Sequence, residues 1–271
     1  MLTEAAFSVG RLFYPSSRAA IVALAGLLLL AANPLTAQQQ APGLPPRVNP
    51  EAQALINKTI QALGGQAFLN FKTMTTRGRA FAIREGATAG LAPFESWVEY
   101  PDKRRLSYGK DKPVILINDG DQAWELDRYG LTSQPAEQVR RWKASNRYSL
   151  ENLLRIRIHD PGVLIQMAGV DFVDNVPTQE IDITEVGGAS IRLDLNRRNF
   201  LPIRIRYRVQ DPKTHDWEEY ADVYSDYRPF QGIQTPKHIT RYIDGERVAE
   251  TFRSSVQYNE DYPADTFRPT R

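Results

Sequence analysis

The residues with the widest range of chemistry in this 271-residue chain are its three histidines, His159, His215 and His238. None of them lies at ligand spacing from another, whereas a metal site needs several nitrogen, oxygen or sulfur ligands close together. The chain has no cysteine, which excludes disulfides, thiol catalysis and cysteine-ligated metals. The sequence therefore predicts neither a metal site nor a cofactor.

Three other motifs have simple structural explanations. The pair Ser107 and Lys110 has the spacing of some acyl-enzymes, but it lies beside a predicted strand and lacks the companion motifs. The segment 118–121 (Asn-Asp-Gly-Asp) lacks the ligand pattern of a calcium loop and is typical of a hairpin turn. Glu218 and Glu219 are adjacent on a predicted strand, so they point to opposite faces and cannot flank one glycosidic bond. We predict that the protein is not an enzyme.

Residues 1–37 have the features of a cleavable secretory signal. Arg11 and Arg18 supply positive charge, an apolar run covers 19–32, and Leu35-Thr36-Ala37 forms a cleavage site. The run of 14 apolar residues is shorter than the roughly 20 that span a bilayer as a helix. We predict a periplasmic or secreted protein that is soluble after cleavage, with a retained N-terminal anchor as the alternative.

The charge balance bears on the partners. The chain has 34 basic and 32 acidic residues, whereas nucleic-acid binding needs a concentrated basic footprint. We therefore expect no nucleic-acid partner. Residues 38–50 are rich in Gln and Pro and predict an extended linker. Residues 51–271 have a size that suits one all-β domain.

The domain should begin with one amphipathic helix. Asn49 can cap it, Pro50 suits its first turn, and Gly64-Gly65 should end it. Apolar residues recur between these points at helical spacing: Ala52, Leu55, Ile56, Ile60 and Leu63. Farther along the chain, residues 136–154 have helical composition and should cover one end of a sheet.

From residue 73 onward, the sequence predicts strands separated by turn signals, which favours a mainly β fold with an antiparallel sheet. Arg204, Arg206 and Arg208 alternate with apolar residues on one of these strands. The arginines form either a basic binding stripe or, as we predict, cross-strand ion pairs on a solvated face. Four acidic residues on candidate neighbouring strands are the expected partners: Asp182, Asp194, Glu218 and Asp222.

The apolar face of so wide a sheet must be covered by a second layer or curl around something. Only about two helices are predicted, so a curled sheet with a partly filled interior is one expectation. Such an interior would accept an apolar ligand. A fully packed core is the alternative, and the pattern alone does not separate the two.

Residues 97–127 resemble the LolA-like family of periplasmic lipoprotein carriers and outer-membrane lipoprotein-sorting proteins. The resemblance lies in Trp97-Val98, then Pro101, then the segment VILINDGDQAWELD at 114–127. The segments 224–259 and 265–270 are similar to the tails of lipoprotein-sorting relatives, and 60–78 is similar to their openings. The resemblance implies a half-open barrel of about 11 antiparallel strands, capped by helices around an apolar cavity for acyl chains.

One position departs from the family pattern. The carriers usually place an arginine just before the proline of the Trp-Val-x-x-Pro stretch, where it holds the helical lid closed, and here that position is Tyr100. Tyrosine cannot form the forked, charge-assisted hydrogen bonds of an arginine. This departure favours a looser or differently gated lipid binder.

The function implied is an exported carrier that binds lipid or lipoprotein acyl chains and exchanges them with membrane donor and acceptor proteins. A ligand-sensing regulatory module of the same fold is the alternative, followed by an envelope enzyme. The predicted cavity lining is apolar or aromatic throughout: Val98, Tyr100, Ile115, Ile117, Trp124, Leu126, Ile203, Ile205, Tyr207, Phe252 and Val256.

Overall fold

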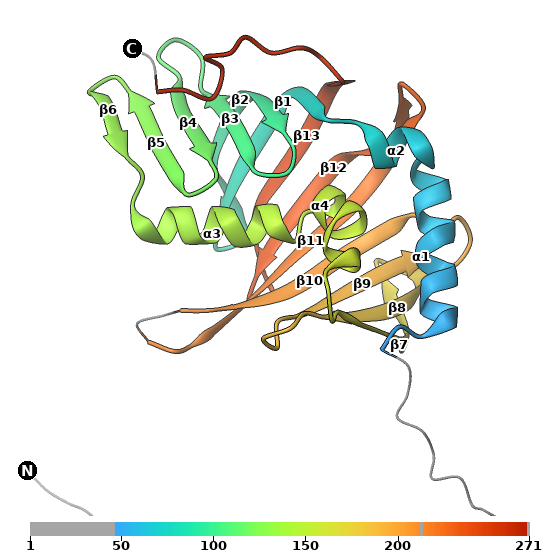
Figure 1. Cartoon of the computed structure of the whole chain (residues 1–271). Coiled ribbons are helices and arrows are strands. Elements are labelled where there is room, and N and C mark those ends of the chain that lie inside the picture. The colour runs from blue at the N-terminus through green and yellow to red at the C-terminus, as the bar shows by residue number, and fades with distance from the viewer. Residues whose placement is uncertain (1–46, 212–213, 270–271) are drawn as a thin grey trace, which may run out of the picture. The chain divides into compact units, whose positions relative to one another are not determined.

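The structure, a computed structural model, describes residues 47–211 and 214–269 (Figure 1). The predicted signal peptide, residues 1–37, lies outside the described residues, as does the predicted linker up to residue 46. The last linker residues belong to the fold, because Val48 forms a bridge with Ile165. Within the described ranges, no helix is long and apolar enough to cross a membrane.

The chain forms thirteen strands and four α-helices in the described part. The helices are α1 (Pro50–Leu63), α2 (Gln66–Asn70), α3 (Ala136–Arg147) and α4 (Leu150–Arg155), followed by a 3-10 turn, η1 (Arg157–His159). The strands are β1 (Thr73–Arg84), β2 (Ala87–Glu99), β3 (Lys103–Tyr108), β4 (Val114–Asp119), β5 (Gln122–Asp127), β6 (Gly130–Ser133), β7 (Leu164–Val173), β8 (Val176–Thr184), β9 (Ser190–Asn196), β10 (Pro202–Gln210), β11 (Trp217–Phe230), β12 (Ile233–Ile243) and β13 (Glu246–Tyr258).

All strands belong to one antiparallel sheet in the order β6-β5-β4-β3-β2-β1-β13-β12-β11-β10-β9-β8-β7. β6 and β7 are its two edges, so the sheet is curved but not closed into a barrel (Figure 1). The mainly β, half-open architecture is confirmed, with two strands more than the alternation had indicated. β6 is too short to show a pattern, and a register shift between Met167 and Gly169 interrupts the alternation of β7.

The first helix forms as its caps predict. The Asn49 side chain accepts hydrogen bonds from the backbone N–H groups of Glu51 and Ala52 at 2.9 and 3.1 Å. Gly64 ends the helix with φ 128°, a conformation that suits glycine. The buried face of α1 belongs to one core cluster with the inner face of β7–β10, whose main members are fully buried: Ile165, Ile181, Ile183, Ile191, Leu193 and Ile205. This part of the sheet is therefore completely covered.

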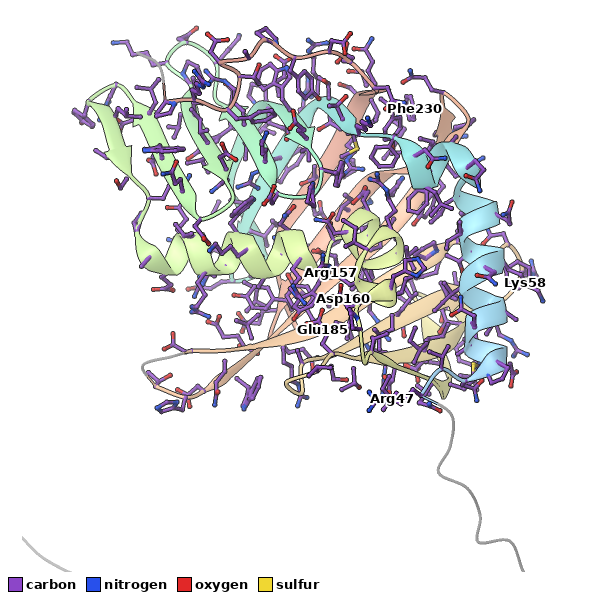
Figure 2. The ribbon with its side chains drawn as sticks, in the orientation of Figure 1. Arg47, Lys58, Arg157, Asp160, Glu185 and Phe230 are labelled. Atoms are coloured by element: carbon purple, nitrogen blue, oxygen red, sulfur yellow. The ribbon has the colours of Figure 1, made fainter. Side chains whose placement is uncertain are left out.

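The predicted helix over 136–154 is two helices, because the chain breaks at Tyr148 and Ser149. The Ser149 hydroxyl then accepts a hydrogen bond from the Asn152 N–H and caps α4. Arg147, at the end of α3, pairs with Glu185 at 2.8 Å and with Asp160 at 3.4 Å. Figure 2 labels Asp160 and Glu185 beside the helix pair. These ion pairs fasten the helices to the end of β8.

The arginine-rich face is the outer face, and ion pairing there is confirmed. Arg204 pairs with Asp194 and Asp171, and Arg206 pairs with Glu180 and Asp194. Two expected partners lie elsewhere. Glu218 pairs with Arg141 of α3, and Asp222 lies on the inner face, where it contributes to the pocket described next.

Candidate functional site

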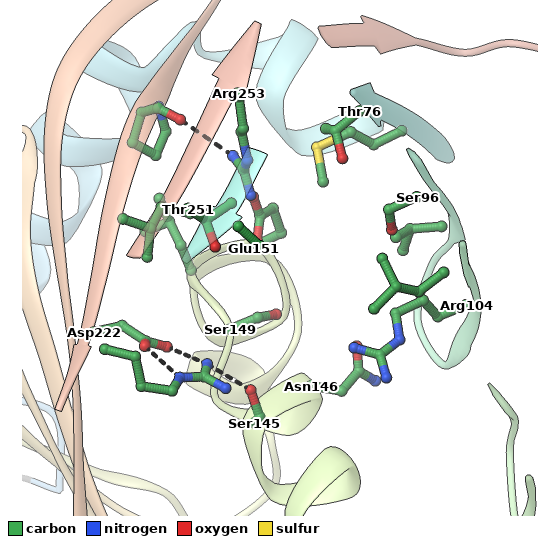
Figure 3. A pocket seen from close by; sticks show the side chains of 18 of the residues that line it. Thr76, Ser96, Arg104, Ser145, Asn146, Ser149, Glu151, Asp222, Thr251 and Arg253 are labelled. Carbon is green, nitrogen blue, oxygen red and sulfur yellow. Dashed lines mark hydrogen bonds and ion pairs between the residues drawn. The ribbon is translucent and has the colours of Figure 1, made fainter. Parts of the chain in front are cut away.

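A pocket of about 330 Å³ lies between the helices and the inner face of β1–β3 and β11–β13. We call this cavity the main pocket. Trp142, Ser145 and Asn146 of α3 form one wall together with the first residues of α4. Figure 3 shows side chains from both the sheet and the helices around it. The inner face is thus packed over β7–β10 and hollow over the first and last strands.

Small side chains on the sheet create the hollow. Thr76 and Ala80 of β1, Ser96 of β2, and Ala249 and Thr251 of β13 all line the main pocket. Paired residues of an antiparallel sheet lie on the same face, and Ser96 pairs with Thr76 while Thr251 pairs with Ala80. A patch of small residues therefore occupies the middle of this half of the sheet, where the other half carries isoleucine and leucine.

A β-bulge decides which residues of β13 face this pocket. Ser255 pairs with Arg77 and Arg253 pairs with Gly78, so Ser254 is the extra residue. A Cβ atom on Gly78 would lie 2.0 Å from the Phe252 carbonyl oxygen, which explains the glycine at this close approach. The bulge shifts the alternation, and Phe252 consequently faces outward although Val256 faces inward.

An ion pair with a buried carboxylate forms one side of the main pocket. Asp222 accepts two hydrogen bonds from Arg241, each 2.7 Å long, and Arg241 also donates to the Ser145 hydroxyl at 2.8 Å (Figure 3). The Asp222 side chain is only 9% exposed, so its charge depends on this partner. Asp222 raises the pKa of Arg241 despite the opposing effect of burial. This pair links the sheet to α3.

Arg104 lies across the main pocket from Asp222 (Figure 3). Its Nη2 donates to the Asn118 side chain at 3.1 Å, and its guanidinium carbon lies 5.8 Å from the centroid of the Trp142 ring. Burial, and secondly repulsion from Arg241, lowers the pKa of Arg104 to about 10. Arg104 therefore remains a cation at neutral pH, at an electrostatic cost to the folded protein.

Tyr100 takes part in an aromatic and cationic cluster at one end of the main pocket. Its ring packs edge-on against Phe71 at 5.1 Å, and the Arg155 guanidinium lies 5.0 Å from the Tyr100 ring centroid. Arg155 also donates hydrogen bonds to the carbonyl groups of Leu69 and Phe71. Burial raises the pKa of Tyr100 well above its usual value, so the phenol stays neutral. Here the cation belongs to helix α4 and the aromatic ring to the turn that follows β2.

Five of the predicted lining residues either line the main pocket or belong to the packed core of the inner face. Val98 and Tyr100 line the main pocket. Ile205, Tyr207 and Val256 belong to the packed core. A sixth, Ile203, lines a separate and more open pocket of about 610 Å³, together with Tyr224 and Tyr227.

The other predicted lining residues face away from the main pocket. Ile115 and Ile117 of β4 pair with Leu126 and Trp124 of β5. Leu116 of β4 is opposite Leu106, which lines the pocket, so Leu116 faces inward. Its neighbours Ile115 and Ile117 therefore face outward, and so do their partners on β5. The C-terminal segment packs on this side of the sheet, where Arg105 donates to the Thr266 carbonyl. The four predicted residues of this hairpin therefore share one face, and the structure places that face away from the main pocket.

Phe252 is also outside the main pocket. Its side chain is 42% exposed and its ring stacks on His238 with centroids 4.2 Å apart. The alternation of β13 had indicated an inward position, but the bulge at Ser254 reverses it. His238 is therefore part of an outer-face aromatic cluster.

Neither the models of protein families nor the sequences of curated proteins match this chain. Solved structures do resemble it. A DUF1329 family protein from Desulfovibrio piger has a TM-score of 0.53 and 12% identity over 80% of this chain and 97% of its own. A putative outer membrane lipoprotein-sorting protein domain from Vibrio parahaemolyticus has a TM-score of 0.50 and 8% identity, covering 80% and 97%. A LolA superfamily protein from Nitrosomonas europaea has a TM-score of 0.50 and 13% identity, covering 80% and 96%.

These similarities extend over nearly the whole length of each solved chain. The low identities limit what they establish to the fold. The LolA-like fold predicted from the sequence is thereby confirmed.

Proposed function

We propose that this protein binds the apolar chain of a lipid or lipoprotein in the main pocket and carries it within the cell envelope. The observation that supports this most directly is the hollow half of the inner face, where small side chains leave about 330 Å³ beneath α3 and α4. Small-molecule sites commonly measure about 300 to 1,000 Å³ and are mostly apolar. The main pocket lies at the lower end of that range.

The size of the pocket suits a carrier. Burial of each CH₂ group contributes about 0.8 kcal/mol, so complete burial of a long acyl chain would make release slow. A pocket at the small end of the range holds only part of such a chain. Partial burial keeps the chain out of water and still allows transfer.

The fold supports the same function, since one protein with this architecture carries the description of an outer membrane lipoprotein-sorting domain. On this proposal the signal peptide directs the chain to the periplasm or outside the cell. The partners would be a donor and an acceptor of the lipid at membranes. No catalytic step is required of the protein.

The test makes the same change, serine to phenylalanine, once on each face of the sheet. Ser96 on β2 lines the main pocket, whereas Ser107 on β3 is paired with Glu95 and Ile115 on the outer face. Binding of the uncharged amphiphile 1-monopalmitoylglycerol is measured by displacement of the neutral dye N-phenyl-1-naphthylamine. We expect Ser96→Phe to fill the hollow and weaken binding about tenfold or more, and Ser107→Phe to bind as the unchanged protein does.

Folding of both variants is checked by circular dichroism. A folded Ser96→Phe variant that binds monopalmitoylglycerol with unchanged affinity would contradict the proposal. So would an unchanged protein that binds neither the dye nor the amphiphile.

A further inference from the structure

We infer that the main pocket selects an amphiphile with an anionic head, a carboxylate or phosphate oxyanion, and that Arg104 is the residue that pairs with this head. The inference rests on the proposed function and narrows it. It predicts that the pocket prefers an anionic lipid to a lipoprotein, because the ester and amide groups at an acylated protein terminus are uncharged.

The first support is the unmet charge of Arg104. Within residues 47–211 and 214–269, its side-chain hydrogen bond goes to the amide oxygen of Asn118, and no carboxylate lies within ion-pair distance. Its Nε is buried and has no hydrogen-bond partner. A guanidinium offers five donors in a fork that matches carboxylate and phosphate oxygens. The side chain therefore has donors available for an oxyanion.

The second support is the charge balance around Arg104. Asp222, the carboxylate on the opposite wall, is already held by Arg241 through two hydrogen bonds. Repulsion from Arg241 acts on Arg104, and Asp222 is paired with Arg241 and not with Arg104. Glu151, another acidic residue of the lining, exerts its effects on a different group that includes Tyr100 and Arg155. An anion beside Arg104 would relieve this imbalance.

The third support is the arrangement of polar and apolar lining. Arg104 pairs with Val98 across β2 and β3, and the next inward residue along β3 is Leu106, opposite Ser96. Phe94 and Leu106 continue the lining away from Arg104. Figure 3 places Arg104 next to Asn146 of α3, at the polar side of the pocket. Phe94 and Leu106 thus form an apolar stretch of lining beside a cation, as an amphiphile requires. The other charged lining residues come from β11–β13 and α4: Asp222, Arg241, Arg253 and Glu151.

The experiment compares two ligands with the same chain. Palmitate carries a carboxylate at mildly alkaline pH, and 1-monopalmitoylglycerol is uncharged. A charge-assisted hydrogen bond in a buried site corresponds to a difference in affinity of about 10- to 100-fold. We expect the unchanged protein to prefer palmitate by about that factor, and Arg104→Gln to lose the preference while it still binds monopalmitoylglycerol.

Arg105→Gln is the matched control, because Arg105 is the neighbouring residue on β3 and points to the outer face. It should keep the preference. Equal affinity of the unchanged protein for the two ligands, or a preference that survives in Arg104→Gln, overturns the inference and leaves the proposed function standing. Failure of both ligands to bind overturns both. Inorganic phosphate is added as a competitor, and displacement of palmitate by phosphate at equal concentration would indicate a free-anion site and also overturn the inference.

Discussion

The inner face of the sheet has two halves, one that forms a packed core and one that lines a pocket. Over β7–β10, the inner positions carry isoleucine and leucine, and α1 and α4 bury them completely. Over β1, β2 and β13, the equivalent positions carry Thr76, Ala80, Ser96, Ala249 and Thr251 beneath the helix pair. Both halves belong to one antiparallel sheet, and the difference in side-chain volume decides where space remains.

The comparison also separates two kinds of charge. On the outer face, arginines and carboxylates are numerous. Pairs such as Arg192–Asp182 reach solvent, where an ion pair contributes little, whereas Asp194 is fully buried beneath its arginine partners. In the hollow half, fewer charges lie in a poorly solvated pocket, and each one depends strongly on its partner. The same residue types should therefore respond differently to substitution on the two faces.

The largest effect should follow from a charge in the packed half. Ile205 is fully buried, and Ile205→Asp would place a carboxylate in a core without a partner. We expect a loss of about 4 kcal/mol or more, enough to unfold a marginally stable domain. Urea denaturation followed by circular dichroism measures it. Phe252→Asp is the control on the outer face, and a loss of less than about 1.5 kcal/mol is expected there because the side chain is already 42% exposed.

The next effect concerns the ion pair of the main pocket. Asp222→Asn removes the partner of Arg241, whose side chain is 35% exposed, and replaces a carboxylate that is only 9% exposed. We expect a cost of about 2 kcal/mol. Asp182→Asn breaks a comparable pair with Arg192 on the outer face, where the Asp182 side chain is 32% exposed, and should cost less than about 1 kcal/mol. Equal losses of unfolding free energy in the two variants would show that the pocket does not isolate its charges.

The smallest effect has the opposite sign. The pKa of Arg104 is lowered from its ordinary value to about 10, so the unfolded state holds this proton more tightly than the folded state. The folded protein consequently carries a penalty at every pH below about 10, and stability should recover as the pH rises from there toward the ordinary pKa of an arginine. Arg104→Met should remove the penalty and raise the free energy of unfolding near neutral pH by about 1 kcal/mol.

Arg105→Met is the outer-face comparison for this variant, and it should not stabilise the protein. Thermal unfolding of both variants without ligand is sufficient. A destabilised Arg104→Met variant would mean that the Asn118 and Trp142 contacts outweigh the cost of the buried charge.

Much of the fold followed from the sequence because its signals are local. The cap at Asn49, the alternation in β8–β10 and the turn at Asp244-Gly245 each depend on neighbouring residues, and each is present in the structure. The break between α3 and α4 was missed because residues 136–154 have helical composition throughout, and only Ser149 marks the new cap.

The site was predicted less well because its residues depend on which face each strand presents. The β4–β5 hairpin carries apolar residues on both faces. Its sequence therefore could not indicate that Leu116 faces inward and that Ile117 is buried on the outer face, where the C-terminal segment packs. Arg104 and Asp222 were overlooked as pocket residues because charged side chains on strands usually mark a solvated face. Their register against Val98 and Arg241 was the missing information.

Because Ser254 is an extra residue in β13, the bulge in this strand determines which side chains face the pocket, and so how much of the pocket they fill. The end of β13 is anchored, because the Tyr258 hydroxyl shares a hydrogen bond of 2.7 Å with Thr235. Regular pairing without the bulge would therefore shift the preceding residues of β13 by one position, so that Phe252 would take the inward position of Thr251. In a chain without the bulge, the Phe252 ring would fill part of the pocket. Relatives that have this bulge should therefore bind a ligand there, and relatives that lack it should not.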